Sequence, residues 1–395
     1  MNREEKFDIV IVGCGCSGLY TALHLPRDKK ILMICKEDLE SCSSMLAQGG
    51  ICVQHDDDDY DSFFEDTMKA GHYENRKESV DIMIRSSRHV IDELLKLGVR
   101  FDMQEDGTLN YTREGAHAKP RICFHEDITG KEITTTLLYH VTKLDNVEIR
   151  EYTTMTDIIV EDGVCKGIIA TTKDGDTLTI HADDTVWATG GVGGLYEHST
   201  NFPCCTGDAV RIAQERQVEV EHLDYVQIHP TTLYKEGPGR SFLISESTRG
   251  EGALLLNSKG ERFVNELLPR DVVTNAIREE MAKEGTKHVW LSFEKIPADE
   301  IRSHFPHIYE TCLEAGYDIT KEPAPVVPAQ HYFMGGVHVD RNSHTTMEHL
   351  YAVGETACNG VHGKNRLASN SLLESLVFAE RAAYRITNPG KELAI

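Results

Sequence analysis

The feature that most limits the possible folds is a glycine-rich turn near the N-terminus. Residues 7–12 form the nearly continuous apolar run of a buried parallel strand. The turn follows at once, apolar residues then recur at near-helical spacing to Leu25, and residues 30–35 form a second apolar run. The turn consists of Gly13, Cys14, Gly15, Cys16, Ser17 and Gly18.

Each glycine of this turn has a separate task in a strand–turn–helix unit. Gly13 permits the tight turn, Gly15 lets the backbone approach a pyrophosphate, and Gly18 lets the helix pack on the strand. The phosphates then lie on free N–H groups at the helix N-terminus. The sequence therefore predicts an α/β, Rossmann-like domain that binds a dinucleotide. An NAD site expects an acidic residue at the end of the second strand, where this sequence has Cys35 and Lys36. Glu37 and Asp38 lie just beyond, so NAD stays open as the ligand at this point.

The rest of the chain divides into segments of different character. Apolar residues recur at helical spacing from Ser79, and short strands with Asp-Gly hairpin signals fill residues 147–180. Residues 350–355 repeat the strand-then-glycine pattern, and residues 372–385 indicate a closing helix. We expect a first part of the dinucleotide domain at 1–222, an inserted α+β capping domain at 223–332 and the second part at 333–395.

Three local features are predicted within these segments. Pro269 marks a helix start, residues 323–328 with their three prolines are expected to form a loop, and the acidic run at 55–59 is expected to be a solvated loop.

Charge and apolar content exclude some partners. The 395 residues carry 41 Lys and Arg against 64 Asp and Glu, for a formal net charge of -23. This argues against nucleic acid and anionic membranes as partners, so an anionic substrate needs a local basic pocket. No apolar run approaches the ~20 residues of a membrane span. The N-terminus lacks the apolar core of a signal peptide, and the eleven cysteines include no Cys-x-x-Cys pair. We expect a cytoplasmic protein with reduced thiols and no metal.

Four ordered motifs resemble those of one superfamily, which comprises the succinate dehydrogenase and fumarate reductase flavoproteins and L-aspartate oxidase. They are the glycine turn, residues 43–50, residues 188–191, and residues 354–355 with 369–374. The resemblance runs from Ile9 to Glu374 and implies that FAD, not NAD, is the dinucleotide. By this resemblance the FAD contacts are the residues of the turn together with Lys36, Ser43, Ser44, Met45, Leu46, Ala47, Gln48, Gly49, Gly50, Gly190, Asp208, Glu355, Ser371 and Leu372.

Ser43 bears on how the flavin is attached. The membrane-bound members of the superfamily have at this position a histidine that bonds covalently to FAD, and serine cannot form that link. The resemblance thus implies a non-covalent flavin and disfavours a respiratory complex subunit.

The resemblance also implies a dicarboxylate site around the inserted region. His229, Ser245, His331 and Arg366 would hold the substrate carboxylates, and Arg270 would move a proton at the carbon next to the hydride donor. Glu246 and Arg249, three residues apart, resemble the proton relay of the fumarate reductases, but an ordinary helical ion pair remains equally open. Ser245 stands where threonine is usual, and Lys364 adds a charge beside Arg366.

Residues 112–117 resemble a motif of the L-aspartate oxidases, in which Glu114 would pair with a substrate ammonium. The implied reaction is oxidation of L-aspartate to iminoaspartate, with oxygen or fumarate as electron acceptor. Quinolinate synthase would then consume the product in NAD biosynthesis.

Two rival functions remain open. One is a soluble fumarate reductase or succinate-oxidising flavoprotein, and the other is a flavin-binding scaffold or sensor without turnover. The sequence ends at Ile395, whereas most aspartate oxidases continue into a helical domain, so we expect either a short natural form or a truncated chain.

Overall fold

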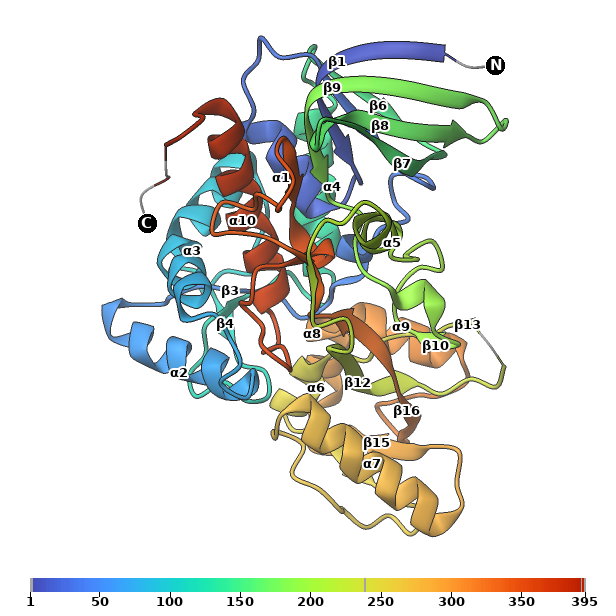
Figure 1. Cartoon of the computed structure of the whole chain (residues 1–395). Helices are drawn as coiled ribbons and strands as arrows, with labels where there is room; N and C mark the ends of the chain where they lie inside the picture. The colour runs from blue at the N-terminus through green and yellow to red at the C-terminus, as the bar shows by residue number, and fades with distance from the viewer. Residues whose placement is uncertain (1–2, 238, 392, 394–395) are drawn as a thin grey trace.

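The computed structural model describes residues 3–237, 239–391 and 393. Its larger sheet has the strand order β6-β2-β1-β9-β8-β7, with β18 paired to β9 (Figure 1). The parallel strands are β1 (Arg3–Val12), β2 (Ile31–Ile34), β6 (Val147–Arg150), β9 (Thr177–Trp187) and β18 (Leu350–Ala352). An antiparallel meander of β7 (Thr153–Glu161) and β8 (Val164–Thr172) leads into β9. The predicted Rossmann-like fold is confirmed.

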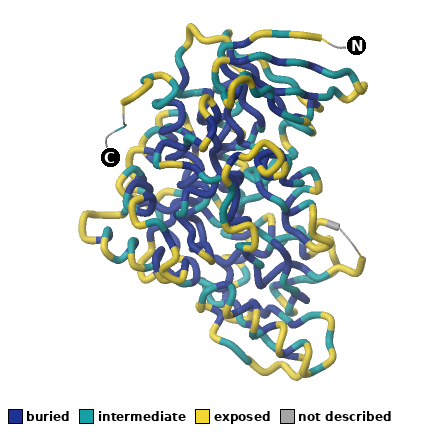
Figure 2. Tube along the Cα trace, in the orientation of Figure 1, coloured by how far each residue is buried: buried dark blue, intermediate teal, exposed yellow. Residues whose placement is uncertain are grey.

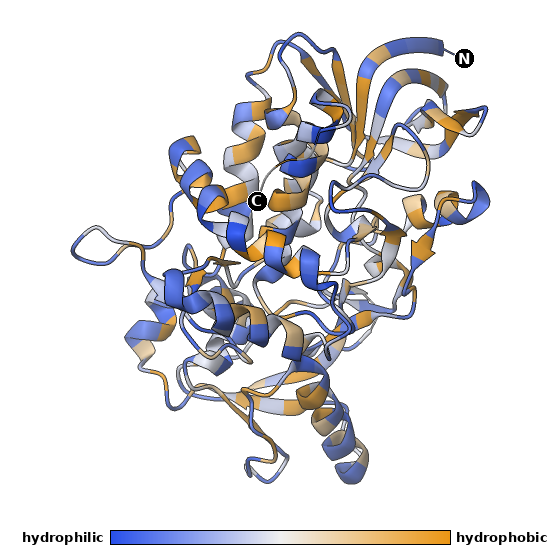
Figure 3. Ribbon diagram, turned by 60° about the vertical axis from the view of Figure 1, so that its left-hand side comes forward, coloured by the Kyte–Doolittle hydropathy of each residue, from blue (hydrophilic) through white to orange (hydrophobic). Residues whose placement is uncertain are grey.

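Both faces of this sheet are buried, which explains the continuous apolar runs of its strands. Ile9 and Ile11 of β1 pack into one apolar cluster, while Val10 and Val12 pack into another on the opposite face. The first cluster includes residues of α1 (Cys16–His24), α3 (Lys77–Leu97), α4 (Thr129–Val141) and α10 (Asn370–Thr387). The second includes residues of α5 (Asp208–Glu215). Figure 2 shows this buried interior, and Figure 3 shows hydrophobic and hydrophilic residues alternating along the helices.

A second sheet lies mainly in the inserted region, and the segment before the insert adds the strand β10 (His198–Ser199) to it. It contains β10, β12 (Val226–Leu233), β13 (Gly239–Arg240), β14 (Leu254–Leu256), β15 (Val289–Ser292) and β16 (Ala324–Phe333). Around it lie α6 (Glu246–Gly250), α7 (Arg270–Glu284), α8 (Ala298–His304) and α9 (Pro306–Glu314). A separate apolar cluster, whose buried members run from Leu233 to Val326, fills this region. We retain residues 223–332 as the proposed capping domain.

Two small sheets and the helix α2 (Tyr60–Ala70) lie outside the two larger sheets. One sheet joins β3 (Ile51–Cys52), β4 (Tyr111–Thr112) and β5 (Ile122–Cys123), and the other joins β11 (Val220–Glu221), β17 (Gly336–His338) and β19 (Ala357–Cys358). Helix α2 precedes α3. Within the described ranges, no helix combines the length and apolarity needed to cross a membrane.

The predicted loop at 323–328 is wrong, because β16 begins at Ala324. A proline cannot donate a backbone hydrogen bond, but its carbonyl can still accept one. Pro325 does so from the Tyr234 N–H at 2.9 Å. The buried side chains of Ala324 and Val326 add to the apolar cluster of the insert, so packing outweighs the disruption by the prolines.

The acidic run at 55–59 is also not wholly solvated, because the Asp59 side chain is fully buried. Both of its carboxylate oxygens accept from the guanidinium of Arg121, at 3.0 and 2.8 Å, and Arg121 is itself buried. Asp66 makes a further ion pair with Arg121 at 2.6 Å. The run predicted a loop, but its last member is half of a buried ion pair.

Replacing Asp59 with alanine should therefore destabilise the protein strongly. The change leaves the buried guanidinium of Arg121 with one carboxylate fewer, and breaking a buried pair in this way costs about 3–5 kcal/mol. With an unfolding entropy of about 2.1 cal/mol/K per residue, the melting temperature should fall by about 4–6 °C. The control is Asp57→Ala, which removes an exposed partner of Arg88 and should shift the melting temperature by less than about 1 °C. Equal shifts for both variants would contradict this assignment.

Candidate active site

A cavity of about 320 Å³ lies where the carboxyl ends of the parallel strands meet the inserted region. Most of the residues predicted from the sequence line it. From the nucleotide-binding set they are Gly13, Cys14, Gly15, Cys16, Ser17, Lys36, residues 43–50, Gly190, Asp208, Glu355, Ser371 and Leu372. From the substrate set they are Glu114, His229, Ser245, Glu246, Arg270, His331 and Arg366. Gly18 and Arg249 are not among the lining residues and lie behind this surface.

The glycine turn has the tight geometry that a dinucleotide loop needs. Gly13 has φ +118°, and a Cβ there would lie 2.0 Å from the Ala188 carbonyl oxygen. A Cβ at Gly18 would lie 2.1 Å from the Gly13 carbonyl oxygen, so this glycine serves the packing of helix on strand. Gly15 caps α1 without a side chain, which leaves the start of the helix open toward the cavity. This arrangement suits a pyrophosphate.

Lys36 is held inside the cavity and is not a free surface lysine. Its ammonium donates to the Asp208 carboxylate at 2.9 Å and to the Thr206 hydroxyl at 2.7 Å. Asp208 begins α5 behind Gly207, which takes the left-handed conformation. The pair therefore joins the end of β2 to the start of α5 at one wall of the cavity.

Residues 43–50 run along the cavity and connect it to the inserted region. They begin with a short 3₁₀ helix, η1 (Ser43–Leu46), and the Ser44 hydroxyl accepts from the Cys16 N–H at 3.0 Å. The Gln48 amide donates to the Leu243 carbonyl across the cavity at 2.8 Å. Gly50 lies too close to the Cys123 carbonyl for any side chain, since a Cβ would approach it to 2.4 Å.

Glu355 closes the cavity from the C-terminal part of the chain. Its carboxylate accepts from the Phe333 N–H at 2.9 Å, and a Cβ at Gly191 would lie 2.3 Å from it. Burial raises the pKa of Glu355 to about 7. This carboxyl can therefore accept or donate a hydrogen bond near neutral pH.

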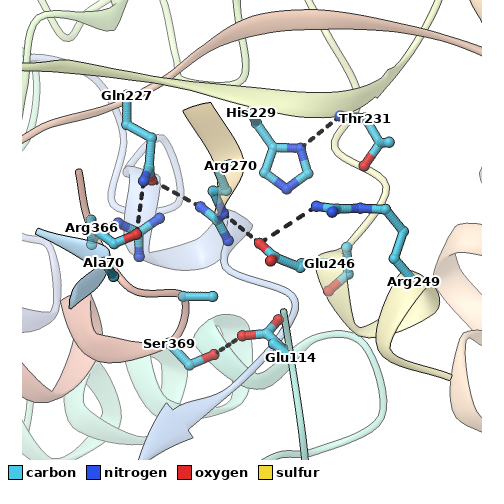
Figure 4. A network of polar contacts seen from close by, with 12 residues as sticks. Ala70, Glu114, Gln227, His229, Thr231, Glu246, Arg249, Arg270, Arg366 and Ser369 are labelled. Atoms are coloured by element: carbon cyan, nitrogen blue, oxygen red, sulfur yellow. Dashed lines mark hydrogen bonds and ion pairs between the residues drawn. The ribbon is translucent and has the colours of Figure 1, made fainter. Parts of the chain in front are cut away.

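Three buried side chains form an ion-pair chain at the opposite end of the cavity (Figure 4). Arg270, at the start of α7, donates through Nε to Glu246 at 2.5 Å. Arg249 lies 3.5 Å from the same carboxylate oxygen, and its Nη1 donates to the Glu266 carbonyl at 2.6 Å. Burial alone would raise the pKa of Glu246, but Arg270 and Arg249 outweigh it and hold this pKa below its ordinary value.

This burial separates the Glu246–Arg249 contact from an ordinary surface ion pair. Both side chains are almost completely inaccessible to solvent, and Glu246 joins Arg249 to the arginine that lines the cavity. The three groups thus form a continuous polar path from the cavity into the inserted region. Such a path suits proton transfer to or from Arg270.

Arg366 is positioned by Ser371, a predicted FAD contact, and by Gln227 and Tyr332, which the sequence did not indicate. Gln227 donates to the Arg366 carbonyl at 2.8 Å and accepts from Arg270 at 3.0 Å, so it fixes the two arginines relative to each other. The Arg366 guanidinium lies 4.4 Å from the centre of the Tyr332 ring and donates to Ser371 at 2.6 Å. The sequence feature that could have identified Gln227 is its position on β12, because it lies two residues before His229 and therefore on the same face of the strand.

The two predicted substrate histidines meet across the site. The rings of His229 and His331 are 5.1 Å apart in an edge-on arrangement. His229 Nδ1 accepts from the Thr231 N–H at 3.2 Å, while its buried Nε2 has no hydrogen-bond partner. Burial, together with nearby arginines that include Arg270, holds the pKa of both histidines well below the ordinary value. A neutral His229 therefore presents a free N–H donor at Nε2, which suits an anionic ligand.

Glu114 lies across the site from the arginines and is held by two serines. Its carboxylate oxygens accept from Ser247 at 3.1 Å and from Ser369 at 2.5 Å. Ser369 takes the left-handed conformation at φ +61°, which is unusual for serine and aims its hydroxyl at Glu114. Burial and the nearby Glu246 raise the pKa of Glu114.

The charges of the described site select the kind of ligand. Three guanidiniums, of Arg249, Arg270 and Arg366, stand with the two carboxylates of Glu246 and Glu114, and the histidines are neutral. These five ionised groups together have one positive charge in excess when Glu114 is ionised. A ligand with two carboxylates and one ammonium carries one net negative charge. Its carboxylates could pair with the arginines and its ammonium with Glu114. Lys364 plays no part in this balance, since its ammonium lies over the Tyr225 ring at 5.7 Å.

The chain is similar to known proteins over most of its length. The family model described as FAD binding domain matches residues 8–372. An L-aspartate oxidase of Clostridium perfringens is 49% identical over 382 residues, which are 96% of this chain and 87% of that protein. An L-aspartate oxidase of Pseudomonas aeruginosa is 40% identical and is matched over 75% of its length.

Solved structures of other proteins have a similar architecture. The FrdA chain of Escherichia coli quinol fumarate reductase matches with a TM-score of 0.90 at 30% identity, over 99% of this chain and 72% of that one. Mycobacterium smegmatis Sdh1 matches with a TM-score of 0.82 at 30% identity, over 99% of this chain and 70% of that one.

Proposed function

This chain belongs to the L-aspartate oxidases of the FAD-binding flavoprotein family, and from that membership we propose that it oxidises L-aspartate to iminoaspartate with FAD as cofactor. The observation that carries the proposal is the placement of Glu114 opposite Arg270 and Arg366 around one cavity. Carboxylate-binding groups at Arg366 and His229, an ammonium-binding carboxylate at Glu114 and a proton-moving group at Arg270 match the groups of aspartate. Succinate would leave Glu114 buried without a cation.

The residues around the cavity fit FAD. The open start of α1 beside Gly15 would hold the pyrophosphate, and Lys36 and Asp208 line the same cavity. Residues 43–50, Glu355, Ser371 and Leu372 would surround the rest of the cofactor. When bound, FAD accepts the hydride that leaves the substrate. Ser43 offers only a hydroxyl near Cys205, so we propose a dissociable flavin.

The substrate is held by groups with separate tasks. Arg366 and the Nε2 donor of His229 would bind carboxylates, with His331 and Ser245 beside them, while Glu114 would bind the ammonium. The guanidinium–carboxylate contact is a charge-assisted hydrogen bond that fixes orientation as well as position. Ser247, Ser369 and Gln227 are positioning residues, because they hold Glu114 and the two arginines.

Arg270 would move the proton. It would take a proton from the β-carbon while the α-carbon loses hydride, which leaves the enamine tautomer of iminoaspartate. Arginine is a poor base, so this role requires a partner, and Glu246 with Arg249 supplies one. With fumarate as electron acceptor, the same arginine would return a proton to the neighbouring carbon. Oxygen is the second proposed acceptor.

Anaerobic reduction of the flavin tests the proposal. L-aspartate should bleach the flavin absorbance, whereas D-aspartate and succinate should leave most of it oxidised over the same time. Bleaching by succinate without bleaching by L-aspartate would overturn the proposal in favour of a fumarate reductase. Denaturing the same preparation with acid should release all FAD into the supernatant.

Two wider points belong to the proposal. Iminoaspartate is unstable, so a consuming enzyme such as quinolinate synthase would take it up for NAD biosynthesis. We place the enzyme in the cytoplasm, which is supported by the free thiols of its cysteines.

A further inference from the structure

A second group of ionisable side chains lies away from the cavity, where three helices meet. His24 ends α1, His89 and Glu93 lie one turn apart on α3, and Glu380 lies on α10. Helix α10 packs against both α1 and α3, and Figure 1 shows α3 beside α10. One ligand atom from each of His24, Glu93 and Glu380 lies within 4.8 Å of the others. His89 contacts both carboxylates.

The spacing within this group matches a metal site. His24 Nε2 lies 3.0 Å from Glu93, and His89 Nε2 lies 3.1 Å from Glu380 and 3.8 Å from Glu93. Zinc bonds of about 2.0–2.1 Å at tetrahedral angles place ligand atoms about 3.3 Å apart. His24, Glu93 and Glu380 already lie close enough to share one ion, and His89 would join them by a movement of its half-exposed side chain.

The hydrogen bonds of His24 favour a metal ligand. Its Nδ1 donates to the Tyr20 carbonyl at 2.9 Å, so a neutral His24 turns the lone pair of Nε2 toward Glu93. Burial alone would lower the pKa of His24, but its hydrogen bond to Glu93 outweighs burial and raises this pKa, so without an ion a proton lies between the two groups and a bound cation would replace it. Metal-binding histidines commonly donate their other ring nitrogen to a backbone carbonyl in this way. Tyr20 also donates its hydroxyl to Glu93 and would orient that carboxylate.

We propose that His24, His89, Glu93 and Glu380 bind one divalent transition-metal ion, for which Zn²⁺ is the best match. Imidazole and carboxylate together suit zinc, whereas magnesium prefers oxygen ligands alone. The site is open to entry, because the His89 side chain is 51% exposed and that of Glu380 is 19% exposed. It lies apart from the residues that would bind flavin and substrate.

The position of the ion gives it a structural task. Helices α1 and α10 both begin at the flavin cavity, where Cys16 and Leu372 line the wall. His24 lies eight residues after Cys16, about 12 Å along the helix axis. An ion there would join α1, α3 and α10 beyond the cavity and would stabilise their packing.

The test compares zinc binding in the FAD-saturated enzyme and its variants. After chelator treatment and dialysis against Zn²⁺, the wild type should retain one more equivalent than His24→Gln or His89→Gln. Zn²⁺ at a hundredfold excess over its Kd should raise the wild-type melting temperature by about 3 °C, and Mg²⁺ should not. Both glutamine variants should lose this shift.

His344→Gln is the matched control, because His344 lies one turn from Glu348 at 3.6 Å, outside the helix junction. It should bind zinc like the wild type. His89 is half exposed, so its variant should fold even if His24→Gln is unstable. Equal zinc content and equal melting shifts in the wild type and His89→Gln would overturn the proposal.

Discussion

Replacing Arg270 with glutamine should abolish nearly all oxidation of L-aspartate and reduction of fumarate, while the protein still folds and retains FAD. Glutamine fills part of the space and can still hydrogen-bond, but it carries no charge and cannot pass a proton to Glu246. A positioned acid–base group contributes about 10²- to 10⁴-fold to a rate. We expect a loss of this size in both reactions, because the same proton is removed in one and returned in the other.

The measurement is anaerobic stopped-flow reduction of the flavin by L-aspartate, followed by reoxidation with fumarate. Arg278→Gln provides the control, because Arg278 is an exposed arginine on the same helix, α7. It should react at the wild-type rate. A rate for Arg270→Gln within about tenfold of the wild type, with an unchanged flavin spectrum, would remove Arg270 from the proton path.

Replacing Glu114 with glutamine should separate the two substrates. Glutamine keeps the size of the side chain and hydrogen bonds with Ser247 and Ser369, but it removes the charge that pairs with the ammonium of aspartate. Loss of one partner of a buried charge pair amounts to about 2–4 kcal/mol, or about 30- to 1,000-fold in kcat/KM. Fumarate has no ammonium, so its reduction should change by less than about fivefold.

The same variant should also change the pH dependence. Burial and the nearby Glu246 raise the pKa of Glu114, and aspartate needs its ionised form. In the wild type, kcat/KM for aspartate should therefore fall as the pH drops through this raised pKa, while fumarate, a dianion, should not lose affinity there. For Glu114→Gln, kcat/KM for aspartate should not show this fall at acidic pH. An unchanged fall in this variant would assign the titration to another group.

The parts of the fold that could be predicted are those in which local pattern and tertiary packing agree. The glycine turn, the hairpins at Asp162-Gly163 and Asp174-Gly175 and the helix after Pro269 all lie where their residues predict them. The prolines at 325 and 328 misled because loss of a donor is a local penalty, whereas β16 is stabilised by its neighbours β12 and β15. Asp59 misled because its partner, Arg121, lies 62 residues away.

The residues of the candidate site also divide into those that the sequence could predict and those that it could not. Arg270 and Glu114 could be predicted because they lie in motifs that resemble those of the family. Ser369 and Gln227 do not stand out, since serine and glutamine are common and their roles depend on what a fold brings near them. Ser369 reaches Glu114 across 255 positions of sequence, a contact that no local pattern records.

The joining of β18 to β9 has a consequence for how the protein is made. Residues 350–352 extend a sheet whose first strand begins at Arg3, and α10 then brings Ser371 and Leu372 to the cavity. A ribosome has therefore synthesised the chain as far as Leu372 before the last wall of the cavity exists. The complete cavity can bind FAD only after this segment has been translated. Nascent chains that pause earlier expose an incomplete binding site, and only the strands already formed protect them from aggregation.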